Sequence, residues 1–261
     1  MREERIEFAG EGGAHEILVP AILRLPRTAG RRPVVVIAHG SNGPDSRGRA
    51  HAQALSEAGL ASLEIDMWAA RGLSGGLDRP KHVGETLPDV FGAFRYLTNR
   101  PEFDPLRIGI MGFSWGGVLS MLTATRAVAR RYLRNGERFA AHGPLYPVCW
   151  LYNHLPGYEF RDLTGAPMLL QCGAADGYDA PDSLQKLLDS LDAPDRACLE
   201  TVVFPGATHA FDQIDEPARL VTDPLAHLGQ GGEVAFTPDR QAGDAARANA
   251  AAFFRRTLFA P

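Results

Sequence analysis

The feature that most constrains this chain is a serine between glycines that directly follows a short apolar run. Residues 107–111 are Arg-Ile-Gly-Ile-Met, and residues 112–117 are Gly-Phe-Ser-Trp-Gly-Gly. This order predicts a buried strand, a tight G-x-S-x-G turn and then a helix. Such a turn strains its central residue, so its neighbours must be small where chain passes close to chain. A phosphate-binding loop would need a lysine that is absent here. The pattern therefore indicates Ser114 as a catalytic nucleophile.

Buried runs alternate with helical segments along the rest of the chain. An early antiparallel strand is expected at about 15–25, and the β-branched run at 34–38 predicts a strand buried on both faces. Further strands are expected at about 60–66, 108–111, 141–146, 168–172 and 198–204, and helices at about 49–58, 87–98, 118–133, 182–191 and 244–258. This alternation predicts an α/β fold, with a mostly parallel central sheet and helices on both faces.

The chain contains no obvious linker. Hydrophobic residues make up 45% of its 261 residues, which suits one domain over 1–261 with a sizeable core. The segment from about 215 to 241 is rich in Pro, Gly and Asp, and we expect a long loop or insertion there, near the site. Sites in such folds form where the carboxyl ends of the strands meet.

The net charge and the cysteine content of the chain limit which binding partners and which cellular location we expect. A net charge of −4 gives no electrostatic signature for nucleic acid or for an anionic membrane. The first residues lack the apolar core of a signal peptide, and no apolar run is long enough to span a bilayer. The three cysteines show no C-x-x-C spacing and are expected to be buried, reduced thiols. These features predict a cytoplasmic protein without a metal or an organic cofactor.

A serine nucleophile needs a general base. Four histidines follow Ser114 in the chain: His142, His154, His209 and His227. His209 comes directly after the last strong predicted strand, which is where a base must lie to reach a serine across the strand ends. We expect the other three histidines to be structural or surface residues.

The base in turn needs a carboxylate that orients it. Asp176 and Asp179 both follow the strand predicted at 168–172. Asp176 is favoured because it comes first after a tight turn and has small neighbours. Asp182 is expected to cap the next helix. Asp212 is expected to be a solvated turn residue, with support of the base as the alternative.

The tetrahedral intermediate of acyl transfer carries an oxyanion, which two preorganised N–H groups stabilise. The first is the backbone N–H of Trp115, the residue after the nucleophile. The second is expected from the loop at 39–43, where Ser41 is favoured and Asn42 is the alternative. His39 is expected to brace this loop.

Four segments together resemble the dienelactone hydrolase family of α/β hydrolases. They are residues 36–40 (Val-Ile-Ala-His-Gly), 112–117, 173–176 (Gly-Ala-Ala-Asp) and 204–212 (Phe-Pro-Gly-Ala-Thr-His-Ala-Phe-Asp). The resemblance runs from about residue 34 to 254. It implies an α/β-hydrolase fold, a triad of Ser114, Asp176 and His209, and an oxyanion hole at Ser41 and Trp115.

The chain departs from this family at two positions. The name-giving enzymes use a cysteine nucleophile where this chain has Ser114, and they carry a regulating glutamate where this chain has Gly40. The resemblance therefore implies a serine carboxylesterase rather than activity on dienelactone itself.

The resemblance also suggests residues that contact the substrate. Residues 66–72 are similar to a family loop whose arginine binds a substrate carboxylate, which implies that Arg71 selects acidic esters or lactones. A solvent-facing loop arginine is the alternative. Trp68 and Tyr146 are expected to line an acyl or alcohol pocket, with core packing as the alternative.

The leading hypothesis is hydrolysis of small carboxylic esters or lactones through an acyl-enzyme. Two alternatives stay open from sequence. One is cleavage of another acyl bond, in a thioester, a short peptide or a C–C substrate, because pocket shape decides specificity. The other is a non-hydrolytic receptor on the same fold. The expected partner is a small molecule, and the oligomeric state is open.

Overall fold

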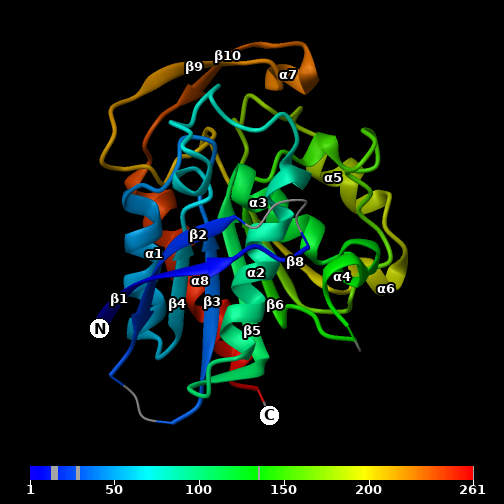
Figure 1. The fold of residues 1–261 in the computed structure, drawn as a ribbon. Helices are drawn as coiled ribbons and strands as arrows, with labels where there is room; N and C mark the ends of the chain where they lie inside the picture. The colour runs from blue at the N-terminus through cyan, green and yellow to red at the C-terminus, as the bar shows by residue number, and fades with distance from the viewer. Residues whose placement is uncertain (13–16, 28–29, 135, 261) are drawn as a thin grey trace.

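A twisted sheet runs through the centre of the molecule (Figure 1). The computed structural model describes residues 1–12, 17–27, 30–134 and 136–260. The strands of the sheet are β1 (Arg2–Ala9), β2 (Leu18–Leu25), β3 (Arg32–Ala38), β4 (Ala61–Ile65), β5 (Phe103–Phe113), β6 (Ala141–Leu145), β7 (Met168–Gly173) and β8 (Leu199–Phe204). Their spatial order is β1-β2-β4-β3-β5-β6-β7-β8. The pairs β1–β2 and β2–β4 are antiparallel, and the remaining pairs are parallel.

Helices cover both faces of this sheet (Figure 1). The helices of the described residues are α1 (Ser46–Glu57), α2 (Leu87–Thr98), α3 (Trp115–Thr123), α4 (Arg126–Tyr132), α5 (Ser183–Asp189), α6 (Ala193–Arg196), α7 (Ala226–Gly229), which lies away from the sheet, and α8 (Arg240–Leu258). On one face α1 packs against α8, and on the other α2 packs against α3. Because the strands β3 to β7 are covered on both sides, almost all their residues are buried. The predicted α/β architecture is confirmed.

Close packing of α8 explains an unusual central strand. β6 contains Gly143 and Pro144 between its paired neighbours β5 and β7. A Cβ at Gly143 would lie 2.9 Å from the ring of Phe254, and a Cβ at Gly109 would lie 2.8 Å from the same ring. Because both strands have glycine at these positions, the Phe254 ring of α8 packs directly against the sheet.

Three predicted elements differ in detail. Residues 118–133, expected to form one helix, lie in α3 and α4, and the Thr125 side chain caps α4 by accepting the N–H of Val128. Asp182 does precede α5, but its side chain makes no capping bond and instead pairs with Lys186 at 3.0 Å. Of the early strand expected at 15–25, residues 15 and 16 lie outside the described residues.

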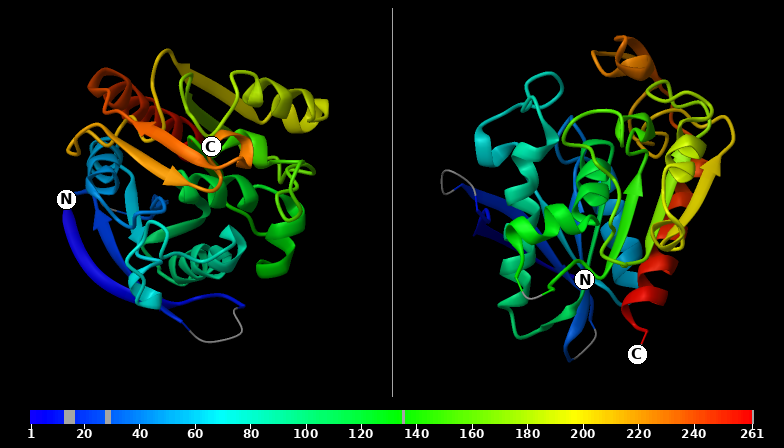
Figure 2. Two further views of the ribbon diagram at one scale, coloured as in Figure 1. Left: turned by 90° about the horizontal axis from the view of Figure 1, so that it is seen from above. Right: turned by 90° about the vertical axis from the view of Figure 1, so that its right-hand side faces the viewer.

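The segment expected as a long loop at 215–241 contains regular structure. β9 (Arg219–Asp223) and β10 (Gly232–Phe236) form an antiparallel hairpin, and α7 lies in their connection. Figure 1 shows this hairpin at the top of the molecule, and Figure 2 shows it from above, where it crosses over the underlying elements. The hairpin therefore covers the end of the sheet at which α3 begins.

The cysteines are all free thiols. Cys149 and Cys172 are buried, with their sulfur atoms 3.8 Å apart, whereas Cys198 is only half-buried. The expectation of a buried thiol is thus wrong for Cys198. Across the described ranges, none of the helices combines the length and the apolar character that crossing a membrane requires.

Candidate active site

Ser114 lies at the turn between β5 and α3, where the sequence predicts a nucleophile elbow. Its backbone has a φ of 50° and a ψ of −108°, a conformation that is costly for a residue with a side chain. A Cβ at Gly116 would lie 2.1 Å from the backbone oxygen of Ala38, and a Cβ at Gly112 would lie 2.4 Å from the backbone of Gly116. Only glycine fits at these two positions. The turn therefore presents the Ser114 side chain at the carboxyl ends of the central strands.

Ser114, His209 and Asp176 form a chain of hydrogen bonds. Ser114 Oγ lies 2.8 Å from His209 Nε2, and His209 Nδ1 lies 2.7 Å from Asp176 Oδ2. His209 and Asp176 are buried, so bulk water competes little for these bonds. The second Asp176 oxygen, Oδ1, accepts the backbone N–H of Tyr178 at 3.0 Å. The structure thus brings together the three side chains that the sequence indicates as a catalytic group.

Asp179, the rival carboxylate, faces a different partner. Its two oxygens accept the backbone N–H groups of Cys149 at 2.9 Å and Trp150 at 2.8 Å. Burial, reinforced by the nearby charge of Asp176, raises the pKa of Asp179 to about 6. Asp179 therefore anchors the segment at residues 149–151, and the structure does not bring it to the imidazole of His209.

The other histidines are held by backbone oxygens away from Ser114. The Nδ1 atom of His142 lies 2.9 Å from the Ser120 oxygen, and burial lowers the pKa of this imidazole to about 3. A ring nitrogen of His154 lies 2.9 Å from the backbone oxygen of Tyr152, and one of His227 lies 2.9 Å from that of Glu233.

His39 braces the loop at 39–43, as predicted. Its Nε2 atom accepts the backbone N–H of Met67 at 3.0 Å, and Nδ1 lies 2.8 Å from the oxygen of Gly40. Burial lowers the pKa of His39 to about 4. A neutral ring is what Nε2 needs in order to accept a hydrogen bond.

The structure places both residues that the sequence favours as oxyanion donors at the pocket of Ser114. Ser41 and Trp115 both line the same pocket as the serine. Within the described residues, neither backbone N–H donates to another protein group. The oxygen of Ser41 accepts the indole N–H of Trp68 at 2.8 Å and the N–H of Gly76 at 2.9 Å. The alternative donor Asn42 also lines a pocket that contains Ser114.

Trp68 and Tyr146 are not pocket residues, which corrects the expectation for both. Trp68 is buried, and its ring lies edge-on against His39 and Trp115 at centroid distances of 4.8 and 5.5 Å. Together with its hydrogen bond to Ser41, this packing makes Trp68 a support of the loop at 39–43. Tyr146 is buried behind His209, and their ring centroids are 4.9 Å apart.

A buried polar network lies behind His209. The Tyr146 hydroxyl donates to Asp212 Oδ1 at 2.5 Å and accepts from the Arg47 guanidinium at 2.9 Å. Although burial opposes ionisation, contacts with His51 and Arg47 hold the pKa of Asp212 below its usual value. The expectation that Asp212 is solvated is therefore wrong, because this network encloses it beneath the His209 loop. Arg47 in turn binds the carboxylate of Asp45.

Arg71 does not reach the site, which corrects the role implied for it. Its guanidinium donates to both carboxylate oxygens of Asp89, at 2.6 and 3.0 Å, and to the backbone oxygens of Met67 and Glu85. Asp89 is fully buried, and burial raises its pKa against the opposing effect of Arg71. Arg71 therefore compensates the charge of Asp89, a buried carboxylate of α2. It is not among the described residues that line the two pockets at Ser114.

Two pockets meet at Ser114. The larger, here called the apolar pocket, has a volume of about 300 Å³. Its walls are mostly apolar side chains, which are Leu77, Pro80, Val83, Trp115, Val118, Val148, Leu151, Tyr158, Tyr178, Pro224 and Leu225. The smaller pocket has a volume of about 60 Å³ and lies between the loop at 39–43, His209 and Phe236 of β10. A substrate carbonyl at Ser114 would thus have space on two sides.

Sequence reasoning missed two charged residues of these walls. Arg79 and Asp223 each line both pockets, and they form an ion pair of 2.8 Å with each other. Asp223 belongs to the hairpin at 219–236, whose position over the sheet has no signal in strand periodicity. Arg79 lies in an irregular loop, and no motif singles it out.

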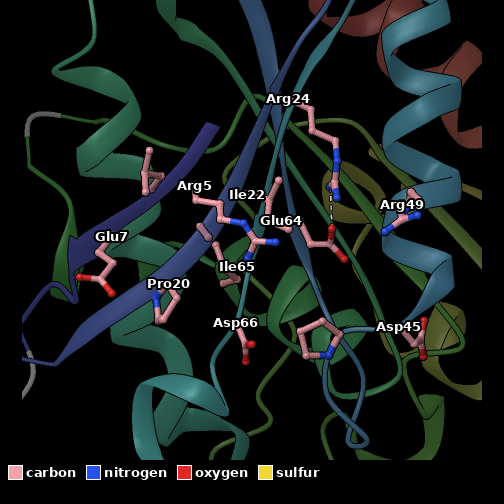
Figure 3. A pocket seen from close by; sticks show the side chains of 13 residues that line it. Arg5, Glu7, Pro20, Ile22, Arg24, Asp45, Arg49, Glu64, Ile65 and Asp66 are labelled. Atoms are coloured by element: carbon pink, nitrogen blue, oxygen red, sulfur yellow. Dashed lines mark hydrogen bonds and ion pairs between the residues drawn. The ribbon is translucent and has the colours of Figure 1, made fainter. Parts of the chain in front are cut away.

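A third pocket lies elsewhere in the molecule. It has a volume of about 770 Å³ and is formed by β1, β2, β4, the first turns of α1 and the residues before α1 (Figure 3). Arg24 and Glu64, which pair at 2.6 Å, lie in it, and Arg5 and Arg49 point into it from opposite sides. Its lining shares no residue with the two pockets at Ser114.

Comparison with known proteins gives a consistent family and fold. A model of the dienelactone hydrolase family matches residues 19–257. A dienelactone hydrolase structure from Anabaena variabilis is 25% identical, with a TM-score of 0.60 over 97% of this chain and 99% of that one. A Pyrobaculum calidifontis esterase is 17% identical, with a TM-score of 0.68 over 99% of this chain and 86% of that one.

Curated sequences add two weaker matches. A Methylorubrum extorquens protein, provisionally named carboxymethylenebutenolidase, is 23% identical over 74% of this chain and 68% of its own length. A segment of 54 residues is 46% identical to an uncharacterised peptidase of Bacillus subtilis. That segment spans only 21% of the length of each protein.

Proposed function

The chain belongs to the dienelactone hydrolase family and so to the carboxylic ester hydrolases, and we propose that Ser114 is its nucleophile. In this proposal His209 is the general base and Asp176 orients the imidazole. The observation that carries it is the hydrogen-bonded chain from Ser114 through His209 to Asp176, with distances of 2.8 and 2.7 Å. Such a chain activates a hydroxyl that is otherwise a weak nucleophile.

The proposed reaction has two halves. Ser114 Oγ attacks the ester carbon while its proton passes to His209 Nε2. The oxyanion that forms accepts the backbone N–H groups of Ser41 and Trp115. His209 then returns the proton to the departing alcohol, which leaves an acyl-enzyme on Ser114. A water molecule, deprotonated by His209, attacks this ester. His209 then returns the proton to Ser114 Oγ as the bond to the acyl carbon breaks and the acid is released. Asp176 stays ionised and stabilises the imidazolium in both halves.

The pocket walls support small esters and lactones as substrates. The apolar pocket of about 300 Å³ suits a hydrocarbon or aromatic group on one side of the scissile carbonyl. The small pocket of about 60 Å³ suits a short group on the other side. A thioester fits the same chemistry, and the shape of the pockets, rather than the catalytic group, decides between the two substrates. We also propose a cytoplasmic location, since the three cysteines are free thiols.

Steady-state hydrolysis of a panel of para-nitrophenyl esters and simple lactones tests this function. We expect sustained turnover of short-chain esters by the native chain, and loss of turnover on the order of a million-fold in Ser114→Ala. Equal rates in the two proteins would contradict the proposal. A stoichiometric burst without further turnover would instead favour a binding protein on the hydrolase fold.

A further inference from the structure

An ion pair joins two segments that wall the pockets. Arg79 lies in the loop before α2, and its guanidinium donates to Asp223 Oδ2 at 2.8 Å and to the Gly76 oxygen at 2.9 Å. Asp223 is the last residue of β9 and uses its other oxygen, Oδ1, to accept the N–H of Leu225. The two side chains are only 11% and 5% exposed. Each charge therefore depends on the other for compensation.

This ion pair lies next to the reacting atoms. Arg79 and Asp223 line both pockets together with Ser114. The guanidinium also lies over the ring of Trp115, 5.7 Å from its centroid, and Trp115 is the residue after the serine. A charged group on a bound ester would consequently meet this pair directly.

The other cations near the site are engaged or exposed. In the described part of the chain, the pocket walls also contain Arg47 and Lys81. Arg47 is bound by the Asp45 carboxylate and the Tyr146 hydroxyl. Lys81 is exposed, so solvent and salt screen its charge. Arg71, which the family resemblance suggests for a substrate carboxylate, is bound by Asp89.

We propose that Asp223 is a specificity-determining residue that restricts this enzyme to uncharged esters by neutralising Arg79. The inference rests on the proposed function and names the substrate class of the same site. A substrate carboxylate that approaches Arg79 either displaces Asp223, which leaves the aspartate charge unpaired in a largely buried position, or lies beside Asp223 as a second negative charge. Both arrangements are unfavourable. An uncharged acyl group leaves the pair intact and fills the apolar pocket beside it.

The proposal predicts opposite effects when either half of the pair is removed. Asp223→Asn leaves Arg79 without its counter-charge, so a carboxylate on the substrate gains a partner. Arg79→Gln leaves Asp223 as an uncompensated negative charge, so a carboxylate is repelled more strongly. General damage to the hairpin would lower turnover of both substrate types and could not produce opposite shifts.

The test uses mono-para-nitrophenyl adipate and its methyl ester, which differ mainly by one negative charge at the far end of the acyl chain. We expect the native enzyme to prefer the methyl ester in kcat/KM by about tenfold or more. Asp223→Asn should reduce this preference by about tenfold, through a lower KM for the free acid. Arg79→Gln should increase it, and the double variant should not gain activity on the acid. Glu216→Gln, which removes an exposed charge outside the pockets, should leave the preference unchanged.

The outcomes separate this inference from the proposed function. If the native enzyme hydrolyses acid and methyl ester equally well, or prefers the acid, the inference is wrong while ester hydrolysis stands. A folded Asp223→Asn variant with an unchanged preference also overturns it. If neither ester is hydrolysed, the proposed function fails and the inference fails with it.

Discussion

At the scale of single residues, two neighbouring carboxylates have different tasks. Asp176 contacts His209, whereas Asp179 contacts two backbone N–H groups. We predict that Asp176→Asn lowers kcat on the order of ten-thousand-fold, because an amide favours the wrong imidazole tautomer. Asp179→Asn removes one of two backbone acceptors and should cost about tenfold or less. Turnover of para-nitrophenyl butyrate by both variants checks the ranking. The reverse ranking would move the orienting role to Asp179.

The indole of Trp68 gives a second residue-scale prediction. Its N–H donates to the Ser41 oxygen, so Trp68→Phe removes one hydrogen bond, worth about 1 kcal/mol, from the loop at 39–43 that is proposed to bind the oxyanion. We expect kcat to fall by about fivefold with little change in KM, because the oxyanion forms after the substrate binds.

Trp150→Phe is the matched control for this variant. Among the described residues, the Trp150 indole nitrogen has no hydrogen-bond partner, so this substitution removes no bond. A comparable fall of kcat in the two variants would show that indole size, rather than the bond to Ser41, is what matters.

At the scale of elements, the junction of β5 and α3 depends on glycine. A methyl group at Gly116 would overlap the backbone of β3 at Ala38, and backbone cannot move aside as a side chain can. We predict that Gly116→Ala lowers the free energy of unfolding by at least about 1–3 kcal/mol and abolishes turnover.

Gly84→Ala is the matched control, because a Cβ there meets nothing within 4 Å. Urea denaturation should give this variant native-like stability. A Gly116→Ala protein with native stability and activity would contradict the close contact between the strands and α3.

Elements with strong local patterns could be predicted from sequence, and those defined by distant contacts could not. Apolar β-branched runs indicated β3 and the end of β5, and the glycine turn indicated the position of Ser114. β1 was missed because it begins with four charged residues, Arg-Glu-Glu-Arg, which suit an exposed edge strand but give no apolar pattern. The segment at 219–236 was expected as a loop near the site, and its two strands were missed because the segment around them is rich in Pro, Gly and Asp.

The same distinction between local sequence patterns and distant contacts applies to the candidate active site. Each predicted catalytic side chain follows a strand end, which sequence order reveals. The partners of Arg71, Tyr146 and Asp212 lie far away in the chain, at Asp89 and in the network around Arg47. No local pattern records such pairing, so whether a polar side chain faces substrate or core could not be predicted.

At the scale of the whole molecule, a buried neutral histidine couples stability to pH. Burial lowers the pKa of His142 to about 3 from an ordinary value of 6.5. Between these values the unfolded chain binds the proton and the folded chain does not, so stability is lost as the pH falls. Replacing His142 by Gln, which can still donate to the Ser120 oxygen, should remove this dependence.

Denaturant unfolding at pH 7 and pH 4.5 measures the effect. Between pH 7 and pH 4.5, the free energy of unfolding of the native chain should fall by about 3 kcal/mol more than that of His142→Gln. Asp179, whose pKa is raised to about 6, contributes in the opposite direction in both proteins and cancels in the comparison. His154→Gln, at an exposed position, should behave like the native chain. Equal losses in native chain and His142→Gln would contradict the account.

Covalent labelling of Ser114 tests the central claim most directly. The chain should be incubated with a fluorophosphonate, and the adduct located by mass spectrometry of the intact protein and its peptides. We predict one adduct per chain, on the peptide that contains Ser114, formed in proportion to the loss of esterase activity, and no adduct in Ser114→Ala. Loss of activity with the label on another residue, or labelling and turnover that persist in Ser114→Ala, would contradict Ser114 as the nucleophile.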